Sequence, residues 1–451
     1  MWAGLVPLGV GFRTTVAETE ISTTERAPEA QPEEPEERPR SFRELLRSAE
    51  IDARLAGMLF ALAVIWVGFH FLSGGTFLTP RNLWNLSVQT SVVAIMATGM
   101  VLIIVSRNID LSVGAMMAAV GMVMGLLQTD WLPRLIGFDH PATWIIALGA
   151  GLALGALIGG FQGVIVAYVG VPSFIVTLGG YLVWRGVAWA LASGQTIAPM
   201  DSNFRLLGGG AEGTTGGMWS WIIGVLACFG IVLLQIQKRR QRARYGFRLR
   251  PLWAEVTLAV VACGAVLGAI AVLNRYYLPP LLAEQRGAPP GAQISLGLAY
   301  PVLITIVVTV VMTFLATRRR FGRYVYAIGG NPEAAELAGI KTKRTTVKTF
   351  ALMGTLVGLA GAVQIARLNA AVSSLGTGME LSVIAAAVIG GTSFSGGIGT
   401  IPGAVLGALV MQSLQSGMVL MGIEAPLQDI VVGAVLVAAV ALDTIIRRRA
   451  A

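Results

Sequence analysis

The chain of 451 residues is 55% hydrophobic, only 13% charged, and carries a formal net charge of +9. Soluble domains average about 25% charged residues, so a chain this long with so few charges needs lipid to cover part of its surface. The composition therefore excludes a string of soluble domains and predicts one membrane domain with a polar tail. Nucleic-acid binding is not expected, because the basic residues cluster in a few loops between apolar runs, as the positive-inside rule describes.

The N-terminal region differs from the rest in composition. Residues 14–40 are rich in Glu, Pro, Thr and Arg and almost devoid of large apolar side chains, so residues 1–40 are predicted to form a disordered cytoplasmic tail. Residues 41–53 have the pattern of an amphipathic helix on the cytoplasmic membrane surface, with Ser41 as its N-cap.

Residues 54–449 are predicted to form the transmembrane domain, an all-α polytopic helical bundle of about twelve crossings, because a crossing needs about 20 apolar residues. The candidate runs are 54–72, 83–106, 111–128, 143–169, 173–192, 218–237, 252–273, 298–317, 349–368, 380–391, 401–421 and 427–446. The run 380–391 is short and is followed by GGTSFSGGIGTIPG, so it is the best candidate for a broken or re-entrant helix. The run 173–192 is a second candidate, since almost no loop precedes it.

Three basic clusters set the predicted orientation. They lie at 238–250, 318–348 and 447–449, and all fall on one side of the membrane if the N-terminus is on that side too. The positive-inside rule then places both termini in the cytoplasm. The chain is thus expected to be a multi-pass protein of the inner cell membrane.

Glycines recur every four residues in one run, at Gly151, Gly155, Gly159 and Gly163. A second, similar series begins at Gly354. Small residues at this spacing predict close helix–helix packing.

Polar side chains inside apolar runs usually face the bundle interior or a pathway. Five amide side chains are candidates for lining a substrate pathway, with helix–helix hydrogen bonding as the alternative for each: Asn85, Gln89, Asn108, Gln162 and Gln364. Arg107 and Asp110 are better explained by a structural role in the connection around 106–112.

The remaining charged and histidine residues of the membrane domain predict few specific interactions. Arg367 and Glu380 form a plausible ion pair. His70 and His140 are the only histidines and are not at ligand spacing, so neither a metal site nor a set of catalytic residues is expected.

The predicted cytoplasmic loop 318–348 contains strong helix signals. Asn331 can cap a helix, Pro332 suits its first position, Glu333 falls in its first turn and Gly339 can end it. The pattern predicts a helix of about two turns outside the membrane. Such a helix suits docking into a groove on a partner, and an ordinary connecting helix is the alternative.

Several long strings resemble the ribose/xylose-type sugar permeases of ABC transporters. They are NLSVQTSVVAIMATGMVLIIVSRNIDLSVGAMMA, VPSFIVTLGGYLVWRG, FGRYVYAIGGNPEAAELAGIKTKR and VIGGTSFSGGIGTIPGAVLGAL. The resemblance covers most of 82–446. The tail and the segment 238–297 depart from shorter ribose-type members, and xylose-type permeases resemble this chain more closely.

The resemblance implies an ATP-driven importer of a monosaccharide, most readily xylose or another pentose. Two permease copies would form the pathway, an external binding protein would deliver the sugar, and cytoplasmic ATPase subunits would bind the coupling loops. In that scheme five residues transmit force to the membrane domain: Asn331, Pro332, Glu333, Glu336 and Gly339. ATP would bind the partner subunit, because this chain has no GxxxxGK[ST] string and needs no cofactor of its own.

The alternative is an ion-coupled secondary transporter of small solutes. Such proteins place ionisable residues at mid-membrane beside broken helices. The acidic candidates fall near the ends of runs, which argues against ion coupling: Asp110, Glu380, Glu424, Asp429 and Asp443.

Overall fold

The computed structural model describes residues 53–247, 249, 251–285, 287 and 289–450. The chain divides into two compact units, Met1–Leu46 and Arg47–Ala451, and all described residues belong to the second unit. The predicted tail 1–40 and all but the last residue of the predicted amphipathic helix 41–53 lie outside the described residues.

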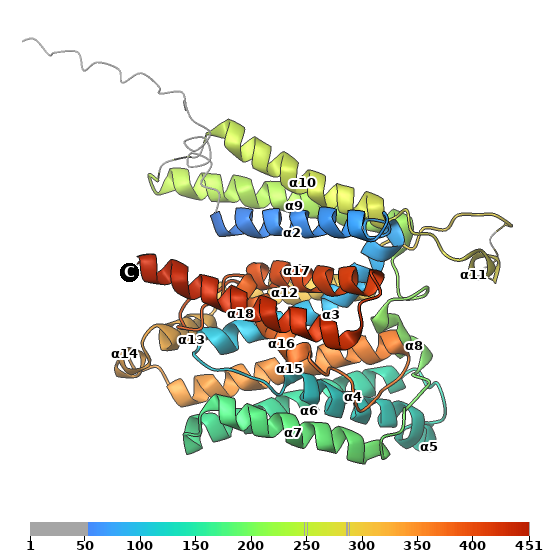
Figure 1. Ribbon diagram of the computed structural model, residues 1–451, viewed down its shortest axis with the longest axis horizontal. Coiled ribbons are helices and arrows are strands. Elements are labelled where there is room, and N and C mark those ends of the chain that lie inside the picture. Colours follow the sequence, from blue (N-terminus) through green and yellow to red (C-terminus); the bar gives the residue numbers. More distant parts are fainter. Residues whose placement is uncertain (1–52, 248, 250, 286, 288, 451) are drawn as a thin grey trace, which may run out of the picture. The chain divides into compact units, whose positions relative to one another are not determined.

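Helices dominate the described residues, in which no named strand occurs (Figure 1). The first half contains α2 (Ala53–Leu72), α3 (Pro80–Val105), α4 (Val113–Leu126), η1 (Leu127–Trp131), α5 (Pro133–Ile136), α6 (Thr143–Val164), η2 (Ile165–Val169), α7 (Ser173–Ala192), α8 (Ser202–Arg205) and η3 (Leu206–Gly208). The second half contains α9 (Gly216–Arg244), α10 (Leu252–Leu273), α11 (Pro280–Gln285), α12 (Tyr300–Arg318), α13 (Arg320–Gly330), α14 (Pro332–Leu337), α15 (Thr342–Leu368), α16 (Met379–Ile389), α17 (Ile401–Leu420) and α18 (Ala425–Ala450).

The predicted number of about twelve crossings agrees approximately with the structure. Ten helices in the described residues are long and apolar enough to span a bilayer, and the shorter apolar stretches of α16 and α18 bring the passes to twelve. The run 173–192 forms one unbroken 20-residue helix, α7, so the interruption considered there does not occur. The short run that begins at Glu380 does form an interrupted pass.

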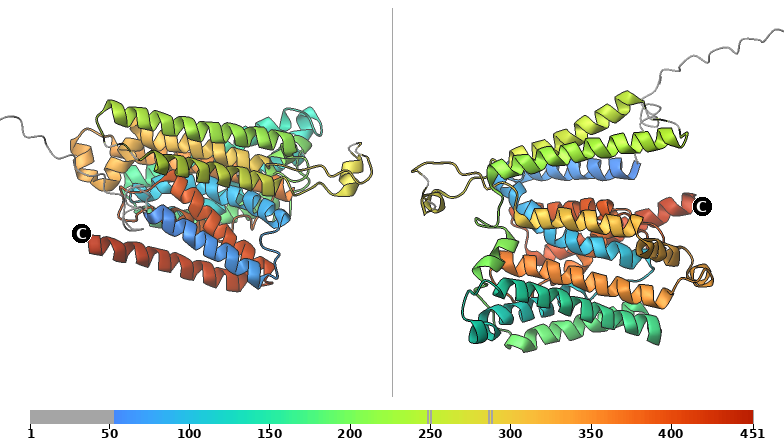
Figure 2. Two further views of the ribbon diagram at one scale, coloured as in Figure 1. Left: turned by 90° about the horizontal axis from the view of Figure 1, so that it is seen from above. Right: turned by 180° about the vertical axis from the view of Figure 1, so that it is seen from behind.

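The long helices share two ends, which are named here the α14 end and the α11 end (Figures 1 and 2). The basic last turns of α9, the basic residues around α13 and the C-terminal end of α18 all lie at the α14 end. The opposite, α11 end carries α5, α8 and α11. The basic clusters of the sequence therefore share one end in space.

The predicted glycine packing joins α6 to α15. A Cβ on Gly155 would lie 2.1 Å from the Gly354 carbonyl oxygen, and one on Gly159 would lie 2.2 Å from the Phe350 carbonyl oxygen. Only glycine permits such backbone contact, which supplies packing where lipid provides no hydrophobic drive between helices. The two helices run antiparallel, because successive glycines of α6 meet earlier residues of α15.

Helix α3 lies at the centre of the domain. In the apolar window that marks it as a membrane span, 94% of the residues are buried, although most other spans expose much of their surface. It packs against α12, α15, α16 and α17. Its core-facing side is closely filled: a Cβ on Gly99 would lie 2.6 Å from the Met353 sulfur. A helix surrounded by protein is positioned by its neighbours and not by lipid.

The first interrupted pass follows α3. Residues 106–112 are not helical, and they lead to α4, whose Gly114 approaches Gly376 and Glu380 at the start of α16. The backbone of this connection finds partners in α7: the Ile109 N–H donates to Ser173 Oγ at 3.1 Å, and the Thr177 hydroxyl lies 3.2 Å from the Ile109 carbonyl oxygen. Non-helical backbone inside a membrane protein requires such partners.

The second interrupted pass follows α15. Residues 369–378 contain no helix and lead to α16. Arg185 of α7 reaches across and donates through Nη1 to the carbonyl oxygens of Ser373, at 2.8 Å, and Leu375, at 2.9 Å. One guanidinium thus satisfies two carbonyl groups that would otherwise lack partners in the bundle.

The two interrupted passes belong to an inverted structural repeat. Helices α3, α4, α6 and α7 correspond to α15, α16, α17 and α18, since α3 packs on α17 as α15 packs on α6, and α4 packs on α7 as α16 packs on α18. Helices α3 and α15 run in opposite directions, since Asn85 near the start of α3 and Arg367 near the end of α15 line the same cavity and Gly99 contacts Met353. The sequence carries a trace of the repeat, Asp110-Leu-Ser-Val113 and Glu380-Leu-Ser-Val383. Inverted repeats are common in transport proteins.

Matching side-chain contacts support the repeat. The Ser112 hydroxyl lies 3.0 Å from the Gln162 side-chain oxygen of α6. In the other half, the Gln415 amide of α17 donates to the Ser382 hydroxyl at 3.1 Å. Ser112 lies just before α4, and Ser382 lies in the first turn of α16. In each half, a glutamine of the following long helix contacts this serine.

Gly354 tests the close packing of α6 and α15. A Cβ at this position would lie 1.9 Å from the Gly155 carbonyl oxygen, so we expect Gly354→Ala to lower the free energy of unfolding by about 2 kcal/mol or more. Gly268→Ala on α10 is the control, because nothing lies within 4 Å of a Cβ there. Equal melting temperatures for the two variants in detergent would contradict the packing.

Candidate functional site

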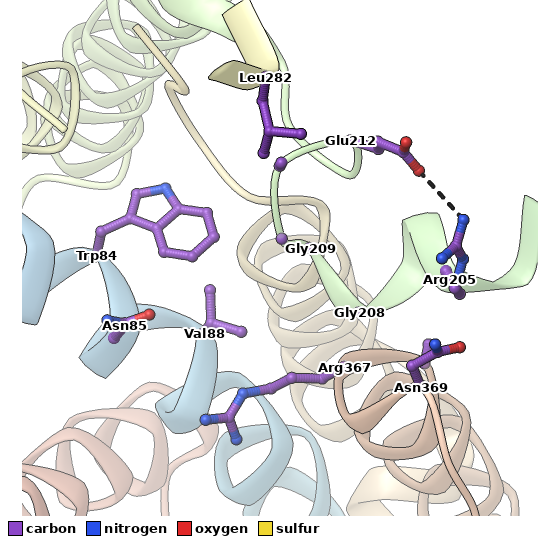
Figure 3. A pocket seen from close by; sticks show the side chains of 13 residues that line it. Trp84, Asn85, Val88, Arg205, Gly208, Gly209, Glu212, Leu282, Arg367 and Asn369 are labelled. Atoms are coloured by element: carbon purple, nitrogen blue, oxygen red, sulfur yellow. Dashed lines mark ion pairs between the residues drawn. The ribbon is translucent and has the colours of Figure 1, made fainter. Parts of the chain in front are cut away.

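A cavity of about 460 Å³ opens at the α11 end of the helices (Figure 3). Its walls come from α3, the end of α15, the segment 205–212 and α11. The residues that line it are Trp84, Asn85, Val88, Arg205, Gly208, Gly209, Gly210, Ala211, Glu212, Leu282, Ala366, Arg367 and Asn369. Figure 3 shows Trp84, Val88 and Leu282 pointing into the cavity, with the Arg367 side chain extending toward α3.

The lining suits a small polar ligand with an apolar face. Trp84 offers an aromatic surface and is held in place, since its Nε1 donates to the Gly297 carbonyl oxygen at 2.9 Å and its ring lies 5.4 Å from that of Tyr276. Asn85, Asn369 and Arg367 supply amide and guanidinium donors. Arg205 and Glu212 form an ion pair of 3.7 Å on the far wall. Hydrogen-bonding groups beside an aromatic ring are typical of small-molecule sites.

The cavity wall is anchored to its surroundings by hydrogen bonds. The Met200 N–H donates to Asn369 Oδ1 at 2.9 Å, and the Asp201 N–H donates to Gln128 Oε1 at 3.1 Å. The backbone N–H and hydroxyl of Ser202 bind Asp139 and hold the pKa of that carboxyl below its usual value. A Cβ on Gly208 would lie 2.1 Å from the Arg367 backbone nitrogen, so the segment is pressed against the end of α15.

Two further predicted pathway residues, Gln89 and Gln364, do not line the cavity but lie one helical turn from residues that do. On α3, Gln89 lies one helical turn after Asn85 and on the same helix face. On α15, Gln364 lies one helical turn before Arg367, again on the same helix face. Gly99 contacts Met353, and Asn85 and Arg367 line the same cavity, so α3 and α15 run antiparallel. Gln89 lies ten residues before Gly99 and Gln364 eleven residues after Met353, so the two glutamines lie at about the same level. Both glutamines are half-buried.

The other two predicted pathway residues lie away from the cavity. Gln162 is 2% exposed and contacts Ser112, while the Asn108 amide donates to the carbonyl oxygen and hydroxyl of Ser106, each at 3.1 Å. Both belong to the connection 106–112 and its surroundings. Their pathway role remains a prediction.

The suggested ion pair between Arg367 and Glu380 does not form. Arg367 lines the cavity, whereas the non-helical residues 369–378 lead to Glu380, which lies against Gly114. The separation of thirteen positions between Arg367 and Glu380 in the sequence did not show that the segment between them turns into the bundle.

The predicted extramembrane helix exists as α14. Asn331 caps it, with its Oδ1 accepting from the Ala334 N–H at 3.0 Å, and Pro332 occupies the first position. Gly339 follows the helix with φ +81°, a conformation that favours glycine. The sequence thus predicted the helix, both of its ends and its cap.

Helix α14 protrudes from the α14 end with one apolar side chain uncovered. Leu337 is 90% exposed, and Glu333 and Glu336 are exposed beside it. Only Ala335 is buried within the helix. A short capped helix with an uncovered leucine beside acidic groups suits insertion into a partner's groove.

Sequence reasoning missed several residues of these sites. Arg205 ends α8 and Glu212 follows in a glycine-rich segment, neither inside a predicted apolar run, and Trp84 falls within the predicted run 83–106. Arg185 sits in α7 as the single charge of that helix, and a charge inside a membrane span was a signal for a buried partner. The repeated Asp/Glu-Leu-Ser-Val string was the signal for the two interrupted passes.

Comparison with known proteins places the chain among permeases. Residues 82–440 match the family described as branched-chain amino acid transport system / permease component. The chain is 40% identical over 387 residues to the xylose transport system permease protein XylH of Haemophilus influenzae, covering 86% of this chain and 95% of that protein. It is 40% identical over 392 residues to XylH of Escherichia coli, covering 87% and 92%.

The similarity extends to a ribose permease at a lower level. The chain is 33% identical over 367 residues to the ribose import permease protein RbsC of Escherichia coli, covering 81% of this chain and 87% of that protein. No solved structure matches the chain.

Replacement of Asn331 tests the cap of α14. Asn331→Ala removes the acceptor for the Ala334 N–H, and we expect amide exchange across 332–338 to accelerate about fivefold, since a lost N-cap costs about 1 kcal/mol. Asn331→Asp retains an acceptor and is the control. Hydrogen–deuterium exchange of the purified chain gives the readout, and equal protection in both variants would show that the cap is dispensable.

Proposed function

The chain belongs to this permease family and is the membrane-spanning permease subunit of a sugar ABC importer, and on that premise we propose that its substrate is a pentose, with xylose the first candidate. The relatives named for xylose match it at 40% identity, above the 33% of the relative named for ribose. The observation that carries the proposal is the cavity of Figure 3, whose donors, acceptors and aromatic face fit a ring of neutral hydroxyl groups.

We propose that this cavity receives the sugar from outside and that Asn85, Gln89 and Gln364 begin its path. Amide groups exchange hydrogen bonds with hydroxyls in both directions. Their position on α3 and α15 lines one route from the cavity toward the bundle interior. Asn108 and Gln162 are candidates for a later stage of the path.

The family position implies an ATPase and an external binding protein as partners, because a permease of this kind hydrolyses no ATP itself. We propose that the ATPase binds α14 through Asn331, Pro332, Glu333, Glu336 and Gly339. The basic residues gathered at the α14 end support a cytoplasmic location for that end, with both chain termini on the same side. A second permease copy would complete the pathway.

Two observations bear on competing substrates and energy sources. Asp110 and Glu380 are buried carboxyl groups beside interrupted helices, as an ion-coupled transporter would need. Neither lines the cavity of Figure 3, and Asp110 is engaged by the backbone N–H and hydroxyl of Ser112.

Arg367 and Glu212 could also hold the carboxylate and ammonium groups of an amino acid, so a competition experiment separates amino acids from sugars as substrates.

The cavity is tested by Asn85→Ala and Arg367→Gln. We expect each variant to lower the initial rate of xylose uptake at low external sugar by about tenfold, because a hydrogen bond to a polar ligand is lost. Arg134→Gln is the control, since Arg134 forms an exposed ion pair with Asp130 and neither residue lines the cavity. Unlabelled xylose should compete with labelled xylose and leucine should not. Normal uptake in both cavity variants, or competition by leucine, would contradict the assignment.

The partner surface is tested by the double variant Glu333→Lys and Glu336→Lys. We expect the ATPase subunit to co-purify with the unmodified chain in mild detergent and to be lost from the double variant, since reversed charges oppose docking. Arg240→Gln, at the same end on α9, is the control. Retention of the ATPase by the double variant would move the docking surface elsewhere.

A further inference from the structure

One side chain joins the end of α3 to the segment that precedes α14. Arg107 donates through Nε to the Gly329 carbonyl oxygen at 2.7 Å and through Nη2 to the Gly330 carbonyl oxygen at 2.8 Å. These are the last two residues of α13, and Asn331, the cap of α14, follows directly. A guanidinium fork satisfies two carbonyl groups at a helix end, where the helix dipole is negative.

The backbone of Arg107 changes the direction of the chain at the same point. Its φ is +63°, a left-handed conformation that residues with a Cβ adopt seldom. The turn closes with the Arg107 N–H donating to the Ile104 carbonyl oxygen at 2.9 Å. It sends the chain out of α3 into the connection that holds Asp110. Unusual backbone conformations of this kind are often found at switch regions.

A second set of contacts joins the end of α3, the end of α13 and the loop that precedes α17. The Gly397 N–H donates to the Val105 carbonyl oxygen at 2.9 Å, and the Tyr326 hydroxyl donates to the Gly399 carbonyl oxygen at 2.7 Å. Gly329 is so close to α3 that a Cβ there would lie 1.7 Å from the Val105 oxygen. The end of α13 is therefore clamped between the end of α3 and the loop that precedes α17.

We propose that Arg107 is the positioning residue through which a movement of α14 reaches α3 and the interrupted pass behind it. This inference rests on the proposed binding of the ATPase to α14. In the chain, α14 is preceded by α13 and followed by α15. The connection to α15 passes through residues 336–339, which are exposed, and Gly339 has a positive φ. The double hydrogen bond of Arg107 links α13 to the buried helix whose other end, at Asn85, lines the cavity.

A lysine cannot replace this link. It offers one ammonium group on a flexible stem, whereas the planar guanidinium holds two successive carbonyl oxygens in a fixed geometry. A glycine at the same position would relax the left-handed backbone and also remove the fork. These two replacements separate transmission from stability.

The test uses the complete transporter in proteoliposomes with its ATPase and binding protein. The readouts are xylose moved per ATP hydrolysed, stimulation of ATP hydrolysis by the loaded binding protein, and the melting temperature of each complex. For Arg107→Lys and Arg107→Gly we expect assembled complexes that hydrolyse ATP, with xylose moved per ATP reduced about fivefold or more, the range of ordinary coupling between sites. Arg107→Gly should melt no lower than Arg107→Lys. The control Arg240→Gln should keep the ratio of the unmodified chain.

The possible failures are distinct. If the unmodified chain does not bind the ATPase or does not couple hydrolysis to xylose, the proposed function fails before Arg107 is reached. If the unmodified chain couples normally and both Arg107 variants keep its ratio, the proposed function stands and this inference is overturned. Variants whose uptake and hydrolysis fall together in proportion to a lower melting temperature would likewise overturn it, because a structural role alone leaves the ratio unchanged.

Discussion

Unpaired backbone is costly inside a membrane, and this constraint governs the arrangement of the whole domain. Two passes of the chain are interrupted, at 106–112 and 369–378, and each needs donors and acceptors from neighbouring helices. Ser173 and Thr177 serve the first interruption, and Arg185 serves the second. All three lie on α7, so one helix supports both interruptions. The positions of α4 and α16 follow from these contacts.

Beside the interrupted passes, α3 is an unbroken and almost fully buried helix between the two ends of the domain. It is 26 residues long, about 39 Å at 1.5 Å per residue, which exceeds the hydrocarbon thickness of a bilayer. Asn85 near its start lines the cavity, and Arg107 just beyond its end holds the carbonyl oxygens of α13. Because protein surrounds α3 on its buried faces, a displacement at one end has to be accommodated by the packing along its length. This geometry connects the substrate side and the ATPase side of the proposed mechanism.

The sequence was sufficient for the features that depend on local chemistry. Apolar runs of the right length predicted the spans, the four-residue glycine spacing predicted close helix packing, which the structure shows between α6 and α15, and Asn331-Pro332 predicted the start of α14. Features that depend on distant residues were not predictable in the same way. Residues 369–378 look like a surface loop in the sequence, but they enter the bundle because Arg185, almost two hundred residues earlier, binds their carbonyl groups.

The candidate site shows the same division. Asn85 was identified because an amide in an apolar run is unusual, and it does line the cavity. Gln162 met the same criterion, yet it lies against Ser112 inside the packing, since an amide can stabilise a helix contact as well as a pathway. Arg205, Glu212 and Trp84 gave no comparable signal, because their role comes from the way the segment 205–212 folds over the end of α15.

The most direct test of the central claim measures xylose accumulation in cells that express the chain with its ATPase and binding protein. Uptake is followed after the ion gradients are collapsed with an uncoupler while ATP is maintained, and after ATP is depleted while the gradients are maintained. The account predicts that accumulation survives the uncoupler and stops when ATP is depleted. Accumulation that stops with the uncoupler and survives ATP depletion would contradict it and identify an ion-coupled transporter.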